Sequence, residues 1–300
     1  MAITAAKMPD ALDKTLTKLF SDAYREVPMD YKKIFGLEKD STDYVKYSSV
    51  GTLGDIPEFT GAGLSALENE QLYDKTLTHV EYAAKYILQR KLMDDNKWKQ
   101  IFDGVSLLGR SARITKEKKH WAILNEAFIT EPSDGDGTEL CASDHPYSPT
   151  DSGTQSNEGT TAFAPTALTA TQILMRKITN SKRQNANIMG DAVIVPVDKY
   201  DTARETILST SKVVSEWSEG VINVENNYNI ISSIYLTDAT DWFMVDTKCM
   251  KRNLLSIQRL PLEFSLTDDF DTFQKWARVY ERYINGWFDW RFIYGHLVSG

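Results

Sequence analysis

The sequence predicts an α+β chain whose long helices and long extended segments occupy separate blocks. Residues 95–128 place apolar side chains at helical spacing, and residues 77–88 and 255–294 alternate apolar and polar side chains as strands do. Residues 164–250 mix short helices with short strands. One long helix and two long extended elements cannot bury their apolar faces by themselves. We therefore expect a chain that completes its packing against neighbouring chains.

The first predicted elements are a helix and a β-arm. Residues 10–26 form an amphipathic pattern that ends before Pro28. An extended segment at 42–50 and the alternating residues 77–88 flank a glycine-rich stretch at 51–66. Two such strands around a glycine-rich tip predict an arm about 40 Å long, at roughly 3.3 Å per residue.

The longest helical signal covers residues 95–128, which would span roughly 50 Å at 1.5 Å per residue. Asp94 or Asp95 is placed to cap its first turn. Gly104 and Gly109 each cost up to about 1 kcal/mol inside a helix. A kink or break near Gly109 is therefore expected.

Residues 131–160 differ in composition from the rest of the chain. They are rich in Gly, Ser, Thr and Pro, and they contain seven acidic residues but no Lys or Arg. Such a segment lacks the apolar side chains that would hold it against a core. It is expected to bury little and to form a mobile surface loop.

Residues 166–250 predict a small mixed α/β unit. Helices are expected at 166–180 and 199–209, and strands at 192–197, 228–236 and 242–246.

The last element is predicted to be a long β-hairpin. Apolar alternation from Leu255 changes parity near Gln258–Leu260, which predicts a β-bulge at that point. Acidic residues at 268, 269 and 271 occupy the turn, and a return strand is expected over 273–294. Its aromatic side chains are expected to pack in a core or an interface.

The composition excludes several classes of protein. The hydrophobic fraction of 42% and the charged fraction of 25% are those of an ordinary folded protein. No apolar run approaches the roughly 18 residues of a membrane helix, and the first residues lack a signal-peptide core. We therefore expect no membrane partner and synthesis in the cytoplasm. A net charge of -8 disfavours a strongly basic face for nucleic-acid recognition.

The motifs that carry enzyme chemistry are missing from the sequence. Cys141, Asp144 and His145 lie close together, but a flexible loop would not orient them for catalysis, so a turn role is favoured. Cys141 and Cys249 are not spaced for a zinc site, and the acids of 133–139 lack calcium-loop spacing. We assign no catalytic, cofactor-binding or metal-ligating residue and expect no cofactor. The basic residues at 116–119 and 177–185 are interpreted as solvated faces or contacts between subunits.

Seven segments carry a family resemblance when they are taken together and in order. They are DNKWKQIFDGVSLLGRSA at 95–112, LCASDHP at 140–146, TQSNEGT at 154–160, MGDAVIVP at 189–196, DWFMVDTK at 241–248, IQRLPLEF at 257–264 and NGWFDWRFIYG at 285–295. This set resembles the tailed-phage major capsid proteins with the Hong Kong 97 fold, in their Mu-like major head subunit branch.

The resemblance implies a fold with a peripheral domain and an axial domain. It divides the chain into an N-terminal arm with a helix at 1–41, an extended β-loop at 42–90, a spine helix at 91–130, a mobile acidic loop at 131–163, an axial domain at 164–250 and a long β-hairpin with a C-terminal strand at 251–300.

The resemblance also implies a function. The chain would self-assemble as hexamers and pentamers into an icosahedral shell, in the head of the virion, that encloses double-stranded DNA without sequence-specific binding. Portal and scaffolding proteins would be partners. An encapsulin-like shell protein, another shell or tail protein of similar fold and a soluble α/β enzyme remain alternatives.

The candidate contacts between subunits lie at the tip of the β-arm. They are Leu53, Ile56, Phe59 and Leu64. The glycines around them leave little core for these side chains within the arm, so they are expected to be exposed in a single chain and covered in an assembly.

Overall fold

The computed structural model describes residues 8–61, 64, 66–129, 132, 134–208, 211–212, 221–222, 228–269, 271 and 274–298. The helices are α1 (Met8–Glu26), η2 (Asp30–Lys33), α2 (Arg90–Asp94), α3 (Trp98–Asn125), α4 (Pro165–Arg176), η3 (Val197–Lys199), α5 (Tyr200–Leu208), α6 (Thr247–Asn253) and η4 (Trp290–Phe292). The strands are β1 (Gly36–Lys39), β2 (Tyr44–Val50), β3 (Gln71–Thr78), β4 (Val80–Leu88), β5 (His145–Ser148), β6 (Asp151–Gln155), β7 (Glu158–Gly159), β8 (Ala192–Pro196), β9 (Ser211–Lys212), β10 (Val221–Ile222), β11 (Asn229–Ser233), β12 (Trp242–Val245), β13 (Leu254–Asp269), β14 (Gln274–Trp287) and β15 (Ile293–His296).

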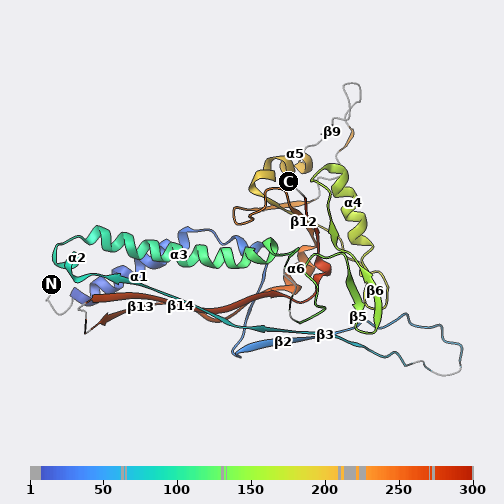
Figure 1. Cartoon of the computed structure of the whole chain (residues 1–300), viewed down its shortest axis with the longest axis horizontal. Coiled ribbons are helices and arrows are strands. Elements are labelled where there is room, and N and C mark those ends of the chain that lie inside the picture. The colour runs from blue at the N-terminus through green and yellow to red at the C-terminus, as the bar shows by residue number, and fades with distance from the viewer. Residues whose placement is uncertain are drawn as a thin grey trace.

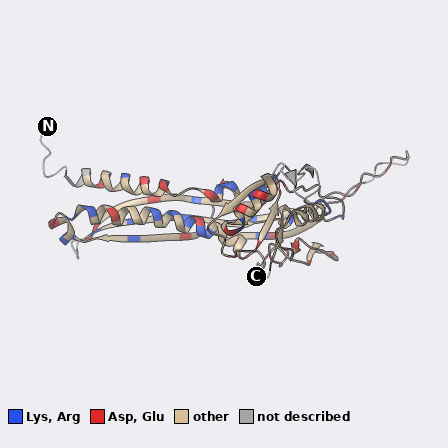
Figure 2. Cartoon of the chain, turned by 90° about the horizontal axis from the view of Figure 1, so that it is seen from above, with Lys and Arg blue, Asp and Glu red and all other residues tan. Residues whose placement is uncertain are grey.

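The chain is elongated, with a narrow body at one end and a more compact domain at the other (Figure 1). Helix α3 and strands β13 and β14 run along the body, and α1 lies beside α3 when the body is seen from above (Figure 2). The β2–β3 pair continues past the compact domain into a long loop. The two parts have different shapes because one is built on a hairpin and the other on short strands.

The body is a four-stranded sheet covered by two helices. The strand order is β1-β13-β14-β4, in which β1 is parallel to β13 and the other pairs are antiparallel. Apolar side chains from α1, α3 and the sheet form one cluster, which includes Leu16, Ile101 and Val279. The predicted bulge is confirmed, since the register of β13 and β14 shifts between Gln258 and Leu260.

Helix α3 runs without interruption from Trp98 to Asn125, so the predicted break near Gly109 is wrong. The two glycines serve close packing instead. A Cβ at residue 109 would lie 2.7 Å from the carbonyl oxygen of Phe20 on α1, and a Cβ at residue 104 would fall on the ring of Tyr86 on β4. Both positions need a residue without a side chain because neighbouring elements approach the helix closely there.

The predicted cap of this helix is also wrong. Asp94 ends the short helix α2, and Asp95 is the residue that follows it. Lys97 precedes α3 and makes no capping hydrogen bond with its side chain. A separate helical turn therefore comes before α3, and the acidic residues belong to that turn.

The β-arm differs from its prediction in its second strand. β2 pairs with β3, which begins at Gln71, whereas β4 leaves the arm and pairs with β14 in the body. The alternation over 77–88 passes through this change of partner at His79 without interruption. A period of two residues reports extended backbone but does not identify the strand alongside.

The compact domain contains a five-stranded sheet in the order β11-β8-β12-β15-β7. All five elements predicted within 166–250 are confirmed as α4, β8, α5, β11 and β12. Helix α6 was not predicted. Its start is capped by Asp246, whose side chain accepts hydrogen bonds from the backbone N–H groups of Lys248 and Cys249.

The return strand of the hairpin is shorter than predicted. β14 ends at Trp287, η4 follows, and β15 crosses into the compact domain, where it pairs with β12. Asp289 accepts a hydrogen bond from the backbone N–H of Arg291 and so starts the 3-10 turn. The alternating aromatic residues predict burial, and β14 and β15 both bury such side chains. The pattern therefore did not reveal that the strand ends at Trp287.

The expectation that the acidic segment buries little is wrong. Leu140, Cys141 and His145 are buried, and β5 and β6 form a hairpin within the segment. Asn157 is also buried, where its amide donates to the carbonyl oxygens of Leu140 and Ile293 and accepts from the N–H of Ala142. Leu140 and Cys141 join the hydrophobic core, and hydrogen bonds compensate for the burial of the polar groups around them.

Candidate assembly surfaces

The loop between β2 and β3 is the most exposed apolar surface of the arm. Exposed fractions are 46% for Leu53, 87% for Ile56, 67% for Phe59 and 93% for Leu64. All four candidate contact residues therefore lie on the surface of the single chain. Exposed apolar side chains that occur together commonly mark an interaction site.

Among the residues that the structure describes, the hydrogen bonds of this loop lie at its base. The N–H of Gly51 donates to the carbonyl oxygen of Glu70 across the arm. The N–H of Thr52 donates to Ser181 Oγ, and Gln184 donates to the carboxylate of Asp55. We name the described residues 56–61, 64 and 66–69 the arm tip. The contacts at the base hold the loop so that the arm tip extends outward (Figure 1).

The charge of the loop is entirely negative. Asp55, Glu58, Glu68 and Glu70 lie within residues 51–70, which contain no Lys or Arg. Glu58 and Glu68 are exposed, and Glu58 directly precedes Phe59. The arm tip therefore combines apolar side chains with the carboxylates of Glu58 and Glu68, which form no ion pair with any described residue.

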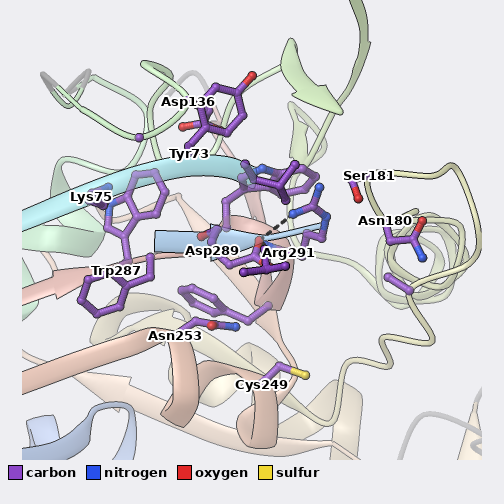
Figure 3. A pocket seen from close by; sticks show the side chains of 18 of the residues that line it. Tyr73, Lys75, Asp136, Asn180, Ser181, Cys249, Asn253, Trp287, Asp289 and Arg291 are labelled. Atoms are coloured by element: carbon purple, nitrogen blue, oxygen red, sulfur yellow. Dashed lines mark hydrogen bonds and ion pairs between the residues drawn. The ribbon is translucent and has the colours of Figure 1, made fainter. Parts of the chain in front are cut away.

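A cavity of about 540 Å³ lies where the β-arm joins the compact domain. We name it the arm-base pocket. Strands β2 and β3, the β5 region, α6 and η4 surround it, and Figure 3 shows its side chains converging from these elements. Aromatic residues provide much of the lining, namely Tyr47, Tyr73, Tyr147, Trp287, Phe288 and Trp290.

Lys75 is an unusual member of this lining. Its side chain comes from β3 and is only 6% exposed, and its ammonium lies 3.2 Å from the centre of the Trp287 ring. Among the residues that the structure describes, no acceptor forms a hydrogen bond with its Nζ. Burial lowers the pKa of Lys75 to about 8, while the nearby carboxylates of Asp136 and Asp134 oppose that shift.

The acidic groups near Lys75 have other partners. Asp136 is hydrogen-bonded to His145 Nδ1 at 2.8 Å, and Asp134 accepts a hydrogen bond from the backbone N–H of Thr76. Asp289 is paired with Arg291, two residues further along the same turn, at 3.0 Å (Figure 3). The positive charge of Lys75 thus lacks a direct carboxylate partner within the described parts of the chain.

Cys141, Asp144 and His145 do not converge on a catalytic site. His145 stacks on Trp290 with ring centres 4.1 Å apart and uses Nδ1 for Asp136. Cys141 is buried against Gly295, and burial raises the pKa of its thiol. Asp144 is exposed, unlike the other two residues. Cys141 and His145 therefore serve packing in the structure.

The basic segments do not form a free positive patch. Lys182 pairs with Glu70 at 3.7 Å, and Arg183 pairs with Asp151 at 2.9 Å. Lys116 is buried in an ion pair with Glu281, so its interpretation as a solvated residue is wrong. Three of the positive residues in these segments, Lys116, Lys182 and Arg183, are therefore engaged by carboxylates of the same chain, whereas Lys118, Lys119 and Lys177 are exposed.

The structure reveals a buried polar stripe on α3 that sequence reasoning missed. Arg113, Lys116, Glu117 and His120 recur three and four positions apart and are all buried. Burial lowers the pKa of His120 to about 3. The helical spacing of these residues was the available signal, but charged side chains at that spacing usually mark the solvated face.

Two further features limit the range of functions. Across the described residues, no group of three or more His, Cys, Asp or Glu side chains is arranged to hold a metal ion. Within the same residues, no helix is long and apolar enough to cross a membrane.

A two-helix body on a long hairpin, a compact sheet domain and a projecting β-arm together define a capsid-type shell subunit. The chain belongs to the phage capsid protein family, which matches residues 73–295. It is accordingly a structural shell protein of the virion capsid and not an enzyme. Comparison with curated proteins gives no match.

Solved capsid structures have the same fold. The procapsid of bacteriophage JBD30 shares 17% identity with a TM-score of 0.55, over 99% of this chain and 77% of that chain. The mature capsid of bacteriophage PhiM1 shares 12% identity with a TM-score of 0.58, over 91% and 88%. A virus-like particle from Pyrococcus furiosus shares 9% identity with a TM-score of 0.52, over 95% and 99%. Identities this low establish the fold alone, whereas the family match favours a phage capsid over the encapsulin-like alternative.

Proposed function

We propose that the chain is a major head subunit of the Mu-like branch and that it builds hexamers and pentamers of an icosahedral shell around double-stranded DNA. The ordered segments from residue 95 to residue 295 support the branch. The axial domain at 164–250 would surround the centre of each hexamer or pentamer. Portal and scaffolding proteins would be partners during assembly.

The observation that carries this proposal is the exposed arm tip. Ile56, Phe59 and Leu64 are each at least two-thirds exposed, on a loop that reaches beyond the compact domain (Figure 1). Burial of such side chains stabilises a contact by roughly 1.5–3 kcal/mol each. A shell repeats the contact at every subunit, so we infer that the β-arm overlaps a neighbouring subunit and that the N-terminal arm at 1–41 adds to this overlap.

Replacement of residues 53–64 by a short Gly/Ser turn tests the proposal. The far-ultraviolet circular dichroism and the thermal transition of the chain should change little, because the apolar side chains that are removed, Leu53, Ile56, Phe59 and Leu64, are exposed. Electron microscopy should then show that shells are lost or are fragile. A control chain with Thr60→Ser and Asn69→Ser keeps the apolar residues and should assemble normally.

Two outcomes would contradict the proposal. Normal shells from the shortened chain would remove the β-arm from the assembly contacts. Loss of folding would place residues 53–64 in the core of the subunit. DNA enclosure is tested separately, by looking for nuclease-resistant DNA in purified heads.

A further inference from the structure

We infer that the arm-base pocket receives the arm tip of a second copy of this chain, with Phe59 seated among the pocket aromatics and the Glu58 carboxylate paired with Lys75. This inference rests on the proposed function, because it specifies the surface that the β-arm contacts. It also names the chemistry of the contact, which is an aromatic side chain next to a carboxylate.

The first step of the argument is the charge of the pocket. Lys75, Arg252 and Arg291 line it together with the acids Asp136 and Asp289. Since Asp289 is paired with Arg291 and Asp136 with His145, the two acids are engaged by other groups. The lining thus carries three cationic side chains against two carboxylates, and its most buried cation, Lys75, has no hydrogen-bond acceptor among the described residues.

The second step is the energetic cost of a buried Lys75 ammonium that has no hydrogen-bond acceptor. A buried ammonium without hydrogen-bond acceptors is unfavourable, and the ring of Trp287 compensates only in part. The lysine side chain can rotate about its own single bonds from the ring toward the cavity. A carboxylate that entered the cavity would gain a charge-assisted hydrogen bond there, in a place where water screens little.

The third step is the complementary charge and shape of the arm tip. Glu58 is exposed and has no ion pair in the described structure, and the adjacent Phe59 is 67% exposed. The aromatic pocket walls suit a phenyl ring, since aromatic pairs add to the stabilisation by burial. The cavity of about 540 Å³ has room for both side chains.

The fourth step excludes the chain's own arm as the occupant. The base of the loop is held at Thr52 by Ser181 and at Asp55 by Gln184, and the arm tip points away from the pocket beyond these contacts (Figure 1). The arm tip of the same chain would have to break this base to fold back. The partner of the pocket is therefore a second copy.

Photo-crosslinking tests this contact in assembled shells. Shells are formed from equal amounts of ¹⁴N- and ¹⁵N-labelled chains that carry p-benzoylphenylalanine in place of Phe59. Irradiation should give mixed-isotope crosslinks to the tryptic peptide 283–291, which contains Trp287 and Phe288. A matched chain with the photoreactive residue at Leu107, which is exposed on α3, should not label this peptide.

Substitutions provide the second measurement. Lys75→Met removes the charge but keeps the length of the side chain, so the thermal transition of the unassembled chain should stay the same or rise. Shells of Lys75→Met and of Glu58→Gln should dissociate at lower denaturant concentration than wild-type shells. Shells of the double variant should dissociate at no lower concentration than those of either single variant. Glu68→Gln removes another exposed acid of the arm tip and serves as the control.

The possible failures are distinguishable. If the shortened arm abolishes assembly but crosslinks map outside the pocket or within one chain, the pocket assignment fails and the assembly role of the β-arm stands. If the shortened arm assembles normally, both fail. Binding of benzoate to the unassembled chain without any 283–291 crosslink in shells would assign the pocket to a small organic anion and overturn the inference.

Discussion

Lys116 on α3 and Glu281 on β14 form an ion pair that is almost completely enclosed, with the two residues 5% and 3% exposed. The pair joins the long helix to the long hairpin at the middle of the body. Lys116 also lies 4.8 Å from the centre of the Tyr283 ring, and Gln258 donates a hydrogen bond to Glu281. The two longest elements of the chain are thus linked by charge in addition to apolar packing.

Removal of one member of this pair should destabilise the subunit strongly. Glu281→Gln leaves the Lys116 ammonium buried without its carboxylate, which is expected to lower the free energy of unfolding by about 3–5 kcal/mol. The double variant Lys116→Met/Glu281→Leu removes both charges and should recover most of that loss. Urea unfolding of the unassembled chain measures both values. Equal stabilities for wild type and Glu281→Gln would mean that the pair contributes nothing to the body.

Gly104→Ala should destabilise the chain although alanine is the better helix former. Alanine gains about 1 kcal/mol in helix propensity, but its Cβ would meet the ring of Tyr86. We expect a net loss of stability in thermal unfolding, with partial recovery when Tyr86→Leu opens space. Gly54→Ala is the control, because a Cβ added there would have no other atom within 4 Å. A stabilised Gly104→Ala chain would contradict the close approach of β4 to α3.

The stability of the unassembled chain should rise with pH through the titration of Lys75. Its pKa falls from the ordinary 10.5 to about 8 on folding, so the unfolded chain binds more protons between these values. Stability therefore increases from about pH 8 to pH 10.5, by on the order of 3 kcal/mol at about 1.4 kcal/mol per pKa unit.

Comparison with Lys75→Met isolates this contribution from other groups, since tyrosines also titrate in the alkaline range. Denaturation at several pH values should give a stability difference between wild type and Lys75→Met that shrinks as the pH rises. A difference that does not vary between pH 7 and pH 10.5 would show that Lys75 is not desolvated.

Limited digestion with a protease that cleaves after glutamate should cut the arm tip first. Glu58 and Glu68 are exposed and lie outside regular structure, whereas Glu139 and Glu158 belong to the packed segment after α3. Mass spectrometry of the early fragments of the unassembled chain identifies the sites. Early cleavage after Glu139 or Glu158 would instead support the sequence-based expectation of a mobile loop over 131–160. In assembled shells, cleavage after Glu58 should slow, because the contact inferred for that residue covers it.

The local elements of the compact domain could be predicted because each has its own periodic pattern. The run AVIVP at 192–196 is apolar throughout and forms the fully buried strand β8. The parity change near Gln258 likewise located a real bulge, since a one-residue shift moves every later side chain to the other face. Such features depend on neighbours in the sequence.

Features that depend on distant neighbours could not be predicted. The strand partner changes at His79, and the space needed by Tyr86 fixes Gly104, but neither relationship leaves a local pattern. His145 is buried because Trp290 lies more than a hundred residues later in the chain and stacks on it. The exposure of the arm tip could be anticipated from its glycines, whereas the pocket at the arm base required the fold.

The position of β15 implies that the sheet of the compact domain is completed last during synthesis. β15 lies between β12 and β7 in the five-stranded sheet, and β7 is the edge strand of that sheet in the described structure. During synthesis residue 158 is made long before residue 293, so β7 cannot pair until β15 has been made. The helices and the hairpin of the body are complete before that point. The sheet closes only after the body has been synthesised. A nascent chain that stalls before residue 293 would thus carry a complete β-arm on an unfinished compact domain, and cellular quality control would have an open sheet edge by which to recognise it.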